Sequence, residues 1–99
     1  MQGVTLDRMA VFATVAETGS FTAAADRLGM AKSAVSQSIS VLERELGTQL
    51  LQRSTRKLAI TESGEAFLAD CRALLEQAEQ LVARARTGKA RPGCRLRLR

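Results

Sequence analysis

The sequence contains no histidine, and its 99 residues include no glycine-rich phosphate-binding loop and no cluster of metal-ligating residue types. Histidine is the side chain best suited to proton transfer near neutral pH. The acidic residues Asp70 and Glu76 fall within a long helical pattern and not in a predicted pocket. We therefore expect neither an enzyme nor a bound cofactor or metal ion.

Cysteine is represented by Cys71 and Cys94 alone, which lie far apart in the chain and form no CxxC motif. No apolar run approaches the roughly 18 residues that a membrane-spanning helix needs. The N-terminus has no charged segment followed by an apolar core, so no signal peptide is predicted. A reduced, cytoplasmic setting without a membrane partner is the expectation.

Aromatic residues are scarce, because the chain has only Phe12, Phe21 and Phe67 and no Trp or Tyr. Hydrophobic residues nevertheless make up 45% of the chain, which is too many for a disordered segment. A core built from Leu, Val, Ile, Ala and Met suits packed helices better than a sandwich of strands. We expect one small, mainly α domain with an appendage.

Positive charge is unevenly distributed along the chain. The net charge is +5, but residues 84–99 hold seven positive residues and no acidic one, which leaves residues 1–83 at −2. The overall basicity is therefore weak support for a nucleic-acid partner. A local group is more informative, since Arg53, Arg56 and Lys57 lie close together without an acid among them.

Periodic apolar residues and capping residues predict three short helices in the first half of the chain. The predicted ranges are 6–18, 21–28 and about 32–46, and a glycine follows each. Thr5 and Ser20 are suitable N-caps for the first two helices. The apolar residues at helical spacing, which we expect to face the core, are Leu6, Met9, Phe12, Ala13 and Ala16 in the first helix and Val35, Ile39, Leu42 and Leu46 in the third.

The apolar period changes at LLQRSTRKLAIT, residues 50–61, where four apolar residues flank a polar, basic turn. We interpret this segment as two short strands joined by a hairpin. Thr61 is then a suitable cap for a long final helix that reaches about residue 87, on the order of 39 Å at 1.5 Å per residue.

One apolar stripe follows the final helix at alternating steps of four and three residues, as in a coiled coil. A body of this size cannot cover the whole stripe, so its far end needs a partner. The simplest partner is the same helix of a second copy, packed antiparallel about a two-fold axis. The alternative is that the stripe folds back on its own domain. The predicted dimerisation residues are Phe67, Cys71, Leu74, Ala78, Leu81 and Ala85.

The second and third helices, joined by a tight turn at 29–31, have the proportions of a helix-turn-helix over residues 21–40. In that motif the second helix lies in the major groove of DNA. Glutamine can pair with adenine in a bidentate manner, and serine can serve bases or phosphates. The outer face of the third helix offers such groups without an acid, whereas an ordinary solvated face usually carries Glu and Lys. This face consists of Lys32, Ser33, Ser36, Gln37 and Ser40, and it predicts double-stranded DNA as the partner.

These features resemble the N-terminal DNA-binding domain of LysR-type transcriptional regulators. The resemblance covers residues 12–67, and its most specific pieces are GSFTAAA, AVSQSISVLERELG and LLQRSTRKLAITESGE. It implies a winged helix-turn-helix domain at 4–61 and a linker and dimerisation helix at 62–87. Residues 88–99, which include RPGCRLRLR, are similar to the family's hinge and the start of its effector domain.

The resemblance also implies a bacterial homodimer that activates or represses transcription from a partial inverted repeat of the T-N11-A type. It implies that a small-molecule effector acts only on a full-length form with an effector domain. The DNA contacts implied by the matching positions are Ser20 and Thr22 at the start of the second helix, Lys32, Ser33, Ser36, Gln37 and Ser40 on the third, and Arg53 and Arg56 in the wing.

Three positions depart from the family pattern. Ala31 stands where a capping serine is usual, and losing that cap costs roughly 0.5–2 kcal/mol unless Ser33 takes over. Ser33 replaces a common proline and Gln37 a common arginine. These two changes leave the base preference open, but they do not oppose docking of the helix in the groove.

Two alternatives stand beside these interpretations. Cys71 is either a redox sensor or, as we favour, a small apolar residue in the helix seam. The chain is either a DNA-binding regulator or an interaction module that dimerises through 62–87 and modulates full-length regulators. Alanine in place of Gln37 and Arg53 would abolish activity in the first case and leave it intact in the second.

Overall fold

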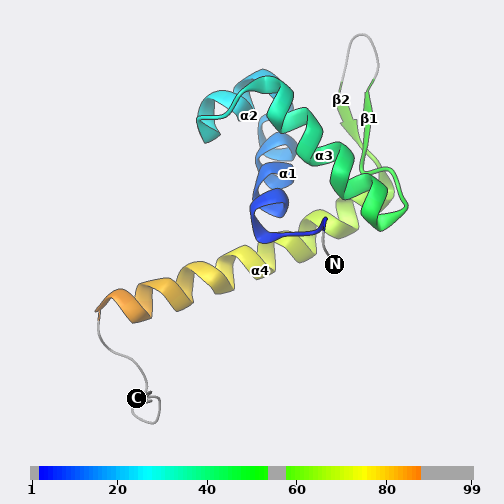
Figure 1. Cartoon of the computed structure of the whole chain (residues 1–99). Helices are drawn as coiled ribbons and strands as arrows, with labels where there is room; N and C mark the ends of the chain where they lie inside the picture. Colours follow the sequence, from blue (N-terminus) through cyan, green and yellow to red (C-terminus); the bar gives the residue numbers. More distant parts are fainter. Residues whose placement is uncertain (1–2, 54–57, 88–99) are drawn as a thin grey trace.

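The computed structural model describes residues 3–53 and 58–87 (Figure 1). Its elements, in chain order, are α1 (Leu6–Thr18), α2 (Phe21–Leu28), α3 (Lys32–Leu46), β1 (Leu51–Arg53), β2 (Leu58–Ile60) and α4 (Glu62–Thr87). In Figure 1, α2 lies above α1, α3 and the two strands lie to the right of α1, and α4 runs beneath α1 and projects away from the body. The predicted mainly α fold with a two-stranded wing is confirmed. Arg56, Cys94 and the predicted hinge at 88–99 lie outside the described residues.

Local capping explains where three of the helices begin. The Thr5 hydroxyl accepts a hydrogen bond from the Arg8 N–H at 3.1 Å, and the Ser20 hydroxyl accepts one from the Ala23 N–H at 3.1 Å. At the start of α4, the Thr61 hydroxyl accepts from the N–H of Gly64 at 2.9 Å. These bonds satisfy N–H groups that have no partner inside the helix. α3 differs, because its N-cap residue forms no side-chain hydrogen bond.

Replacing Ala31 by serine should stabilise the protein by about 1 kcal/mol, because the new hydroxyl would accept a hydrogen bond from the first turn of α3. Ala31 already has the extended backbone of an N-cap, with φ −71° and ψ 146°, so the substitution requires no rearrangement. Urea unfolding followed by circular dichroism would measure the gain. Ala73→Ser, at an exposed site inside α4, is the control and should bring no gain. A gain equal to that of the control would contradict the capping argument.

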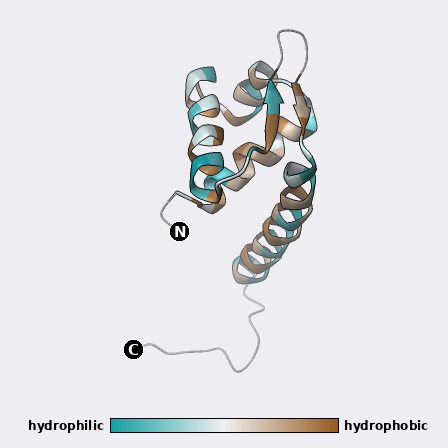
Figure 2. Cartoon of the chain, turned by 90° about the vertical axis from the view of Figure 1, so that its right-hand side faces the viewer, coloured by the Kyte–Doolittle hydropathy of each residue, from teal (hydrophilic) through white to brown (hydrophobic). Residues whose placement is uncertain are grey.

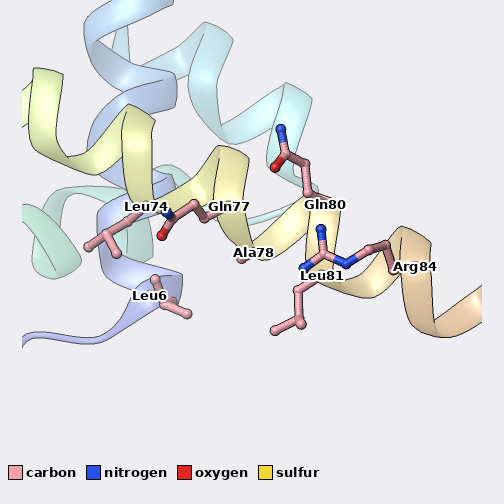
Figure 3. Close-up of a pocket in the computed structure, with 7 residues that line it drawn as sticks. All are labelled: Leu6, Leu74, Gln77, Ala78, Gln80, Leu81 and Arg84. Carbon is pink, nitrogen blue, oxygen red and sulfur yellow. The ribbon is translucent and has the colours of Figure 1, made fainter. Parts of the chain in front are cut away.

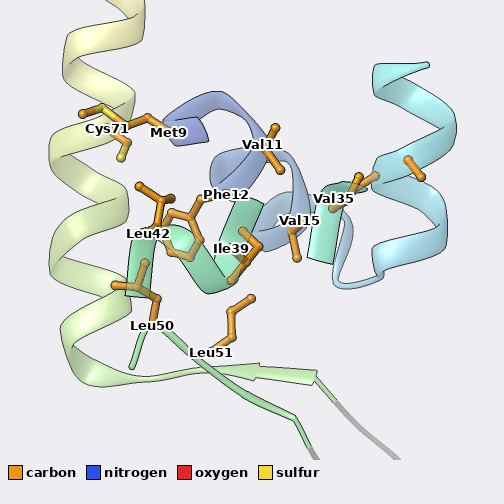
Figure 4. Packing of buried hydrophobic residues seen from close by; sticks show 12 residues of the cluster. Met9, Val11, Phe12, Val15, Val35, Ile39, Leu42, Leu50, Leu51 and Cys71 are labelled. Carbon is orange, nitrogen blue, oxygen red and sulfur yellow. The ribbon is translucent and has the colours of Figure 1, made fainter. Parts of the chain in front are cut away.

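The core lies where α1 crosses α3 and α4. Phe12 is fully buried at its centre, beside Ile39 and Leu42 of α3 (Figure 4). The Phe12 ring also lies 5.8 Å from the ring of Phe67 in α4, centroid to centroid. Leu50 follows the turn after α3 and closes the core from below, with 0% of its surface exposed.

Two predictions of core residues are wrong at the edges of the domain. Leu6 is 49% exposed and Leu46 is 37% exposed. Both belong to helix stripes whose central members are buried, but Leu6 is the first residue of α1 and Leu46 is the last residue of α3. Helical spacing assigns a residue to a face, and it does not show how far along that face the neighbouring elements reach.

The first turns of α4 pack closely on the segment that precedes β1. A Cβ at Gly64 would lie 2.2 Å from the carbonyl oxygen of Leu50, so only glycine permits this approach. That carbonyl also accepts a hydrogen bond from the Thr61 N–H at 3.0 Å. α4 is thereby anchored at its N-terminal end, and its remaining length accounts for the elongated dimensions of 54 × 27 × 21 Å.

Cys71 belongs to the anchored part of α4 and is 1% exposed. Burial, with a smaller effect from the neighbouring Asp70 carboxylate, raises the pKa of the Cys71 thiol to about 11. The thiol is therefore protonated at neutral pH, and a protonated thiol is a poor nucleophile. This environment favours the packing interpretation of Cys71 over a redox sensor.

Candidate nucleic-acid interface

The turn between α2 and α3 has a fixed geometry. Gly29 adopts φ 67°, a left-handed conformation that glycine reaches without steric cost. The N–H of Met30 donates to the carbonyl of Ala25 at 3.0 Å, which closes the end of α2. The turn therefore holds α3 at a defined angle to α2, as a helix-turn-helix requires.

The two faces of α3 differ sharply in burial. Val35, Ile39 and Leu42 on the inner face are each 0% exposed, and burial of each contributes roughly 1.5–3 kcal/mol to holding the helix on the body. On the outer face Ser36 is half-buried, and the exposed members are Lys32, Ser33, Gln37 and Ser40. The structure thus brings all five predicted residues of this helix to one surface.

The outer face of α3 has unused hydrogen-bonding capacity. Within the described ranges, none of its five polar side chains forms a hydrogen bond or ion pair with another residue. The ion pairs in the same ranges join Glu17 to Arg27 at 3.3 Å and to Arg72 at 3.9 Å. The Lys32 ammonium group and the neighbouring hydroxyl and amide groups are therefore available to an external partner.

The start of α2 contributes two further predicted residues. The Ser20 hydroxyl is occupied as the N-cap of α2, where it accepts from the Ala23 N–H, although its own hydrogen remains available for donation. Thr22 is exposed in the first turn of α2. Both hydroxyls lie at the positive end of the helix dipole, where an anionic group is stabilised.

The wing is a short antiparallel pair in which Leu51 pairs with Ile60 and Arg53 with Leu58. Arg53 ends β1 and is exposed. Its guanidinium lies over the ring of Phe21, the first residue of α2, with 5.1 Å between the Arg53 Cζ and the ring centroid. The contact brings the predicted wing arginine next to the start of the helix-turn-helix.

A single carboxylate fastens the wing to α3. The Glu43 Oε2 atom accepts hydrogen bonds from the N–H groups of Leu50 at 2.9 Å and Leu51 at 3.1 Å. Hydrogen bonds to an ionised acceptor are stronger than neutral ones. Glu43 therefore sets the position of β1 relative to α3, although sequence reasoning gave this residue no role. The local sequence shows only that Glu43 is a polar residue near the end of α3. It does not indicate which backbone groups the carboxylate binds.

The structure divides the predicted dimerisation stripe into two parts. Phe67 and Cys71 pack against the core of their own domain, where Cys71 is buried and Phe67 is half-buried beside α1. Their predicted contact with a second chain stays a prediction, and the contact within the chain is one that the prediction did not include. Leu74 and Leu81 are 45% and 60% exposed. Ala78 is half-buried and Ala85 is exposed.

The exposed part of the stripe borders two adjoining hollows between α4 and the start of α1, with volumes of about 390 Å³ and 480 Å³. Leu6 and Ala78 line both hollows. Leu74 and Leu81 lie on the same side of α4 as Leu6 (Figure 3), and hydrophobic segments recur along α4 as it leaves the body (Figure 2). We call this surface the α4 groove: Leu6, Leu74, Leu75, Ala78, Leu81 and Val82.

Leu6 is the member of the α4 groove that sequence reasoning missed as a surface residue. Its helical spacing placed it with the core residues of α1. Its position in the first turn, directly after the cap, was the available signal, since the end of a helix often passes the edge of a small core.

Among the described residues, no helix is both long enough and apolar enough to cross a membrane.

A helix-turn-helix with an acid-free polar outer face and a flanking two-stranded wing defines the winged helix-turn-helix class of nucleic-acid-binding proteins. The family described as "Bacterial regulatory helix-turn-helix protein, lysR family" matches residues 6–65. This match covers more than half of the chain, and the chain belongs to the LysR family.

Curated relatives and solved structures agree with this assignment. A HTH-type transcriptional repressor of Pseudomonas aeruginosa strain UCBPP-PA14 is 48% identical over 93 residues, which is 94% of this chain and 29% of the relative. The HTH-type transcriptional activator AaeR of Escherichia coli strain K12 is 48% identical over 95 residues, 90% of this chain and 31% of the relative. This chain thus spans about 30% of the length of these two relatives.

The structural comparison includes a protein–DNA complex. The crystal structure described as "BenM_DBD/catB site 1 DNA Complex" superposes with a TM-score of 0.82 and 36% sequence identity, covering 88% of this chain and 98% of that chain. The described fold is therefore that of a domain crystallised with DNA.

Proposed function

We propose that this chain is the double-stranded-DNA-binding part of a LysR-type transcription regulator, acting as a homodimer on a partial inverted repeat. The observation that carries the proposal is the outer face of α3, where Gln37 and four further polar residues are available and no acid opposes a phosphate. The proposal assigns base readout to Gln37 and its serine neighbours. Lys32 and Arg53 supply phosphate contacts and salt-dependent affinity, and Arg56 is assigned the same role from its sequence position.

The α4 groove supports the dimer. Val82 is 47% exposed, in addition to the exposed leucines of the groove, and exposed apolar patches of this kind mark interaction sites. Ala78 separates the two hollows and is small enough for a second helix to approach closely. In an antiparallel pair about a two-fold axis at Ala78, Leu74 of one copy would face Val82 of the other, and side chains from each copy would fill the hollows of its partner.

The dimer places constraints on the DNA site. Two copies of α3 would enter successive major grooves on one face of the duplex, about 34 Å apart or a multiple of that distance. A two-fold protein then reads an inverted repeat, and T-N11-A is the pattern we propose. One curated relative is named a repressor and another an activator, so the direction of regulation depends on where the site lies in a promoter.

The proposed functions are assigned to successive segments of the chain. We propose residues 4–61 as the DNA-binding domain and 62–87 as the linker and dimerisation helix. Residues 88–99 lie outside the described part of the chain, and their assignment as a hinge toward an effector domain rests on sequence similarity alone. A small-molecule effector belongs to a form that contains such a domain. The chain itself is proposed to need no cofactor and to catalyse no reaction.

Fluorescence anisotropy would test the proposal. One labelled duplex would carry a T-N11-A inverted repeat from beside the protein's own gene, and the other a scrambled version of it. Both would be titrated between about 50 and 200 mM salt, where phosphate contacts produce a measurable slope. We expect tight binding of two protein chains to the first duplex, and much weaker, more salt-sensitive binding to the second. Equal, weak binding to both would contradict a sequence-specific regulator.

The second candidate function is a dimerising interaction module, and the exposed leucines of the α4 groove are the observation that favours it. Such a module would form mixed dimers with full-length regulators and reduce their activity. In that case the double variant Gln37→Ala/Arg53→Ala would retain the inhibitory activity of the wild type. A well-folded dimer that binds neither duplex would support this second function.

A further inference from the structure

We propose that Phe21 is a positioning residue for Arg53, and that its ring holds the wing guanidinium in the place from which it contacts DNA. The inference rests on the proposed function, because it concerns how the wing is presented to the duplex. The Arg53 Cζ lies 5.1 Å from the centroid of the Phe21 ring. This distance is within the range of about 6 Å over which a cation is attracted to an aromatic face.

The alternation of β1 explains why Arg53 reaches this ring. Side chains two residues apart on a strand point to the same face, so Arg53 faces the same side as Leu51. Leu51 is 2% exposed and belongs to the core, whereas Arg53 is exposed. The core ends between these two positions. Arg53 therefore lies at the edge of the core, where its side chain contacts Phe21, which packs against that edge.

Phe21 is a fixed platform. Its side chain is partly buried and packs against the core cluster. The backbone before it is also held, because the Ser20 N–H donates to the Thr18 hydroxyl oxygen at 3.3 Å and the Ser20 hydroxyl caps α2. A side chain at the end of a short strand is thereby tied to the rigid start of a helix.

The contact leaves the edge of the guanidinium available. Within the described ranges, Arg53 takes part in no ion pair, so no carboxylate competes with a phosphate. A guanidinium carries five N–H donors in one plane, and attraction of the cation to the face of a ring does not require a hydrogen-bond acceptor, so donors remain for a phosphate. Restricting the long side chain before binding lowers the entropy lost when DNA immobilises it.

A double-mutant cycle measured by anisotropy on the inverted-repeat duplex tests the inference. Phe21→Leu keeps an apolar side chain but removes the aromatic face, and should weaken binding about two- to fivefold. Phe21→Tyr keeps the face and should bind as the wild type does. In the Arg53→Ala background, Phe21→Leu should cause no further loss. Equal losses in both backgrounds would overturn the inference, because the ring would then act through the fold and not through Arg53.

NMR without DNA provides a second measurement that does not depend on the leucine variant. The Arg53 side-chain protons nearest the ring should shift upfield in the wild type and in Phe21→Tyr, and a shift at the random-coil position would overturn the inference. Failure of the proposed function is recognised separately, because the wild type would then bind the inverted-repeat duplex no more tightly than the scrambled duplex. If Arg53→Ala binds DNA as the wild type does while the upfield shift is present, the contact exists but the wing has no role in binding, and the positioning claim is also overturned.

Discussion

Replacing Leu81 by glutamate is expected to dissociate the proposed dimer. High-affinity binding to the proposed inverted repeat should be lost at the same time. Leu81 is 60% exposed in the single chain, and two-fold symmetry would bury it twice in the dimer. Full burial of a leucine side chain contributes roughly 1.5–3 kcal/mol, so the exposed 60% of two copies of Leu81 contributes about 2–4 kcal/mol. Losing it, before the cost of burying two carboxylates, raises the dimer dissociation constant at least about 20-fold. Sedimentation velocity would measure the dissociation constant, and anisotropy the accompanying loss of DNA affinity.

The matched control for this prediction is Ala73→Glu. Ala73 is also exposed on α4, but it lines neither hollow of the α4 groove. The control variant adds the same charge to the same helix and should remain a dimer. If both variants dimerise as the wild type does, the α4 groove is not the contact between copies, and the exposed leucines serve another partner.

Replacing Gln37 by alanine is expected to relax the preference for one base pair in each half-site. The side chain is exposed on the outer face of α3, and a bidentate contact to a base contributes roughly 1–3 kcal/mol of discrimination. Anisotropy with a set of duplexes that differ by single base pairs would show this loss at one position, repeated by symmetry in the second half-site. Discrimination at the remaining positions should stay as in the wild type.

Comparison with Lys32→Ala distinguishes a contact to a base from a contact to a phosphate. A phosphate contact carries no sequence information, so this variant should weaken all duplexes alike. It should also reduce the slope of log affinity against log salt by about 0.9 for each contact that is lost. If Gln37→Ala likewise shifts every duplex equally, then Gln37 contacts the backbone and the assignment of base readout to it is wrong.

Much of the fold was predictable because its determinants are local. The caps at Thr5, Ser20 and Thr61 and the glycines after the first three helices lie within one turn of the boundaries that they set. The wing followed from a change of apolar period, and its two strands pair antiparallel, as a hairpin requires. Short-range hydrogen bonds and turns decide these features, so a few neighbouring residues carry the information.

The candidate interface on α3 was also predictable, for a related reason. A helix of regular period separates its faces, and an outer face without acids is recognisable in the sequence alone. The contact between Arg53 and Phe21 was not predictable from the sequence. The hydrogen bonds that the Leu50 and Leu51 N–H groups donate to Glu43 were not predictable either. The first contact joins residues that are distant in the chain, and the second joins a side chain to backbone N–H groups. The residue types alone do not indicate partners of either kind.

Helix α4 shows which features the sequence alone determines and which it does not. Its apolar period determined that α4 is a long helix with one continuous stripe, and that this stripe needs to be covered. Only the tertiary structure decided that Phe67 and Cys71 are covered by the chain's own core, while Leu74 and Leu81 are not. The physical reason is that α1 begins at Leu6 and leaves the rest of α4 without a neighbouring element in the part of the chain that the structure describes. The length over which two helices run side by side depends on their crossing, which helical periodicity does not encode.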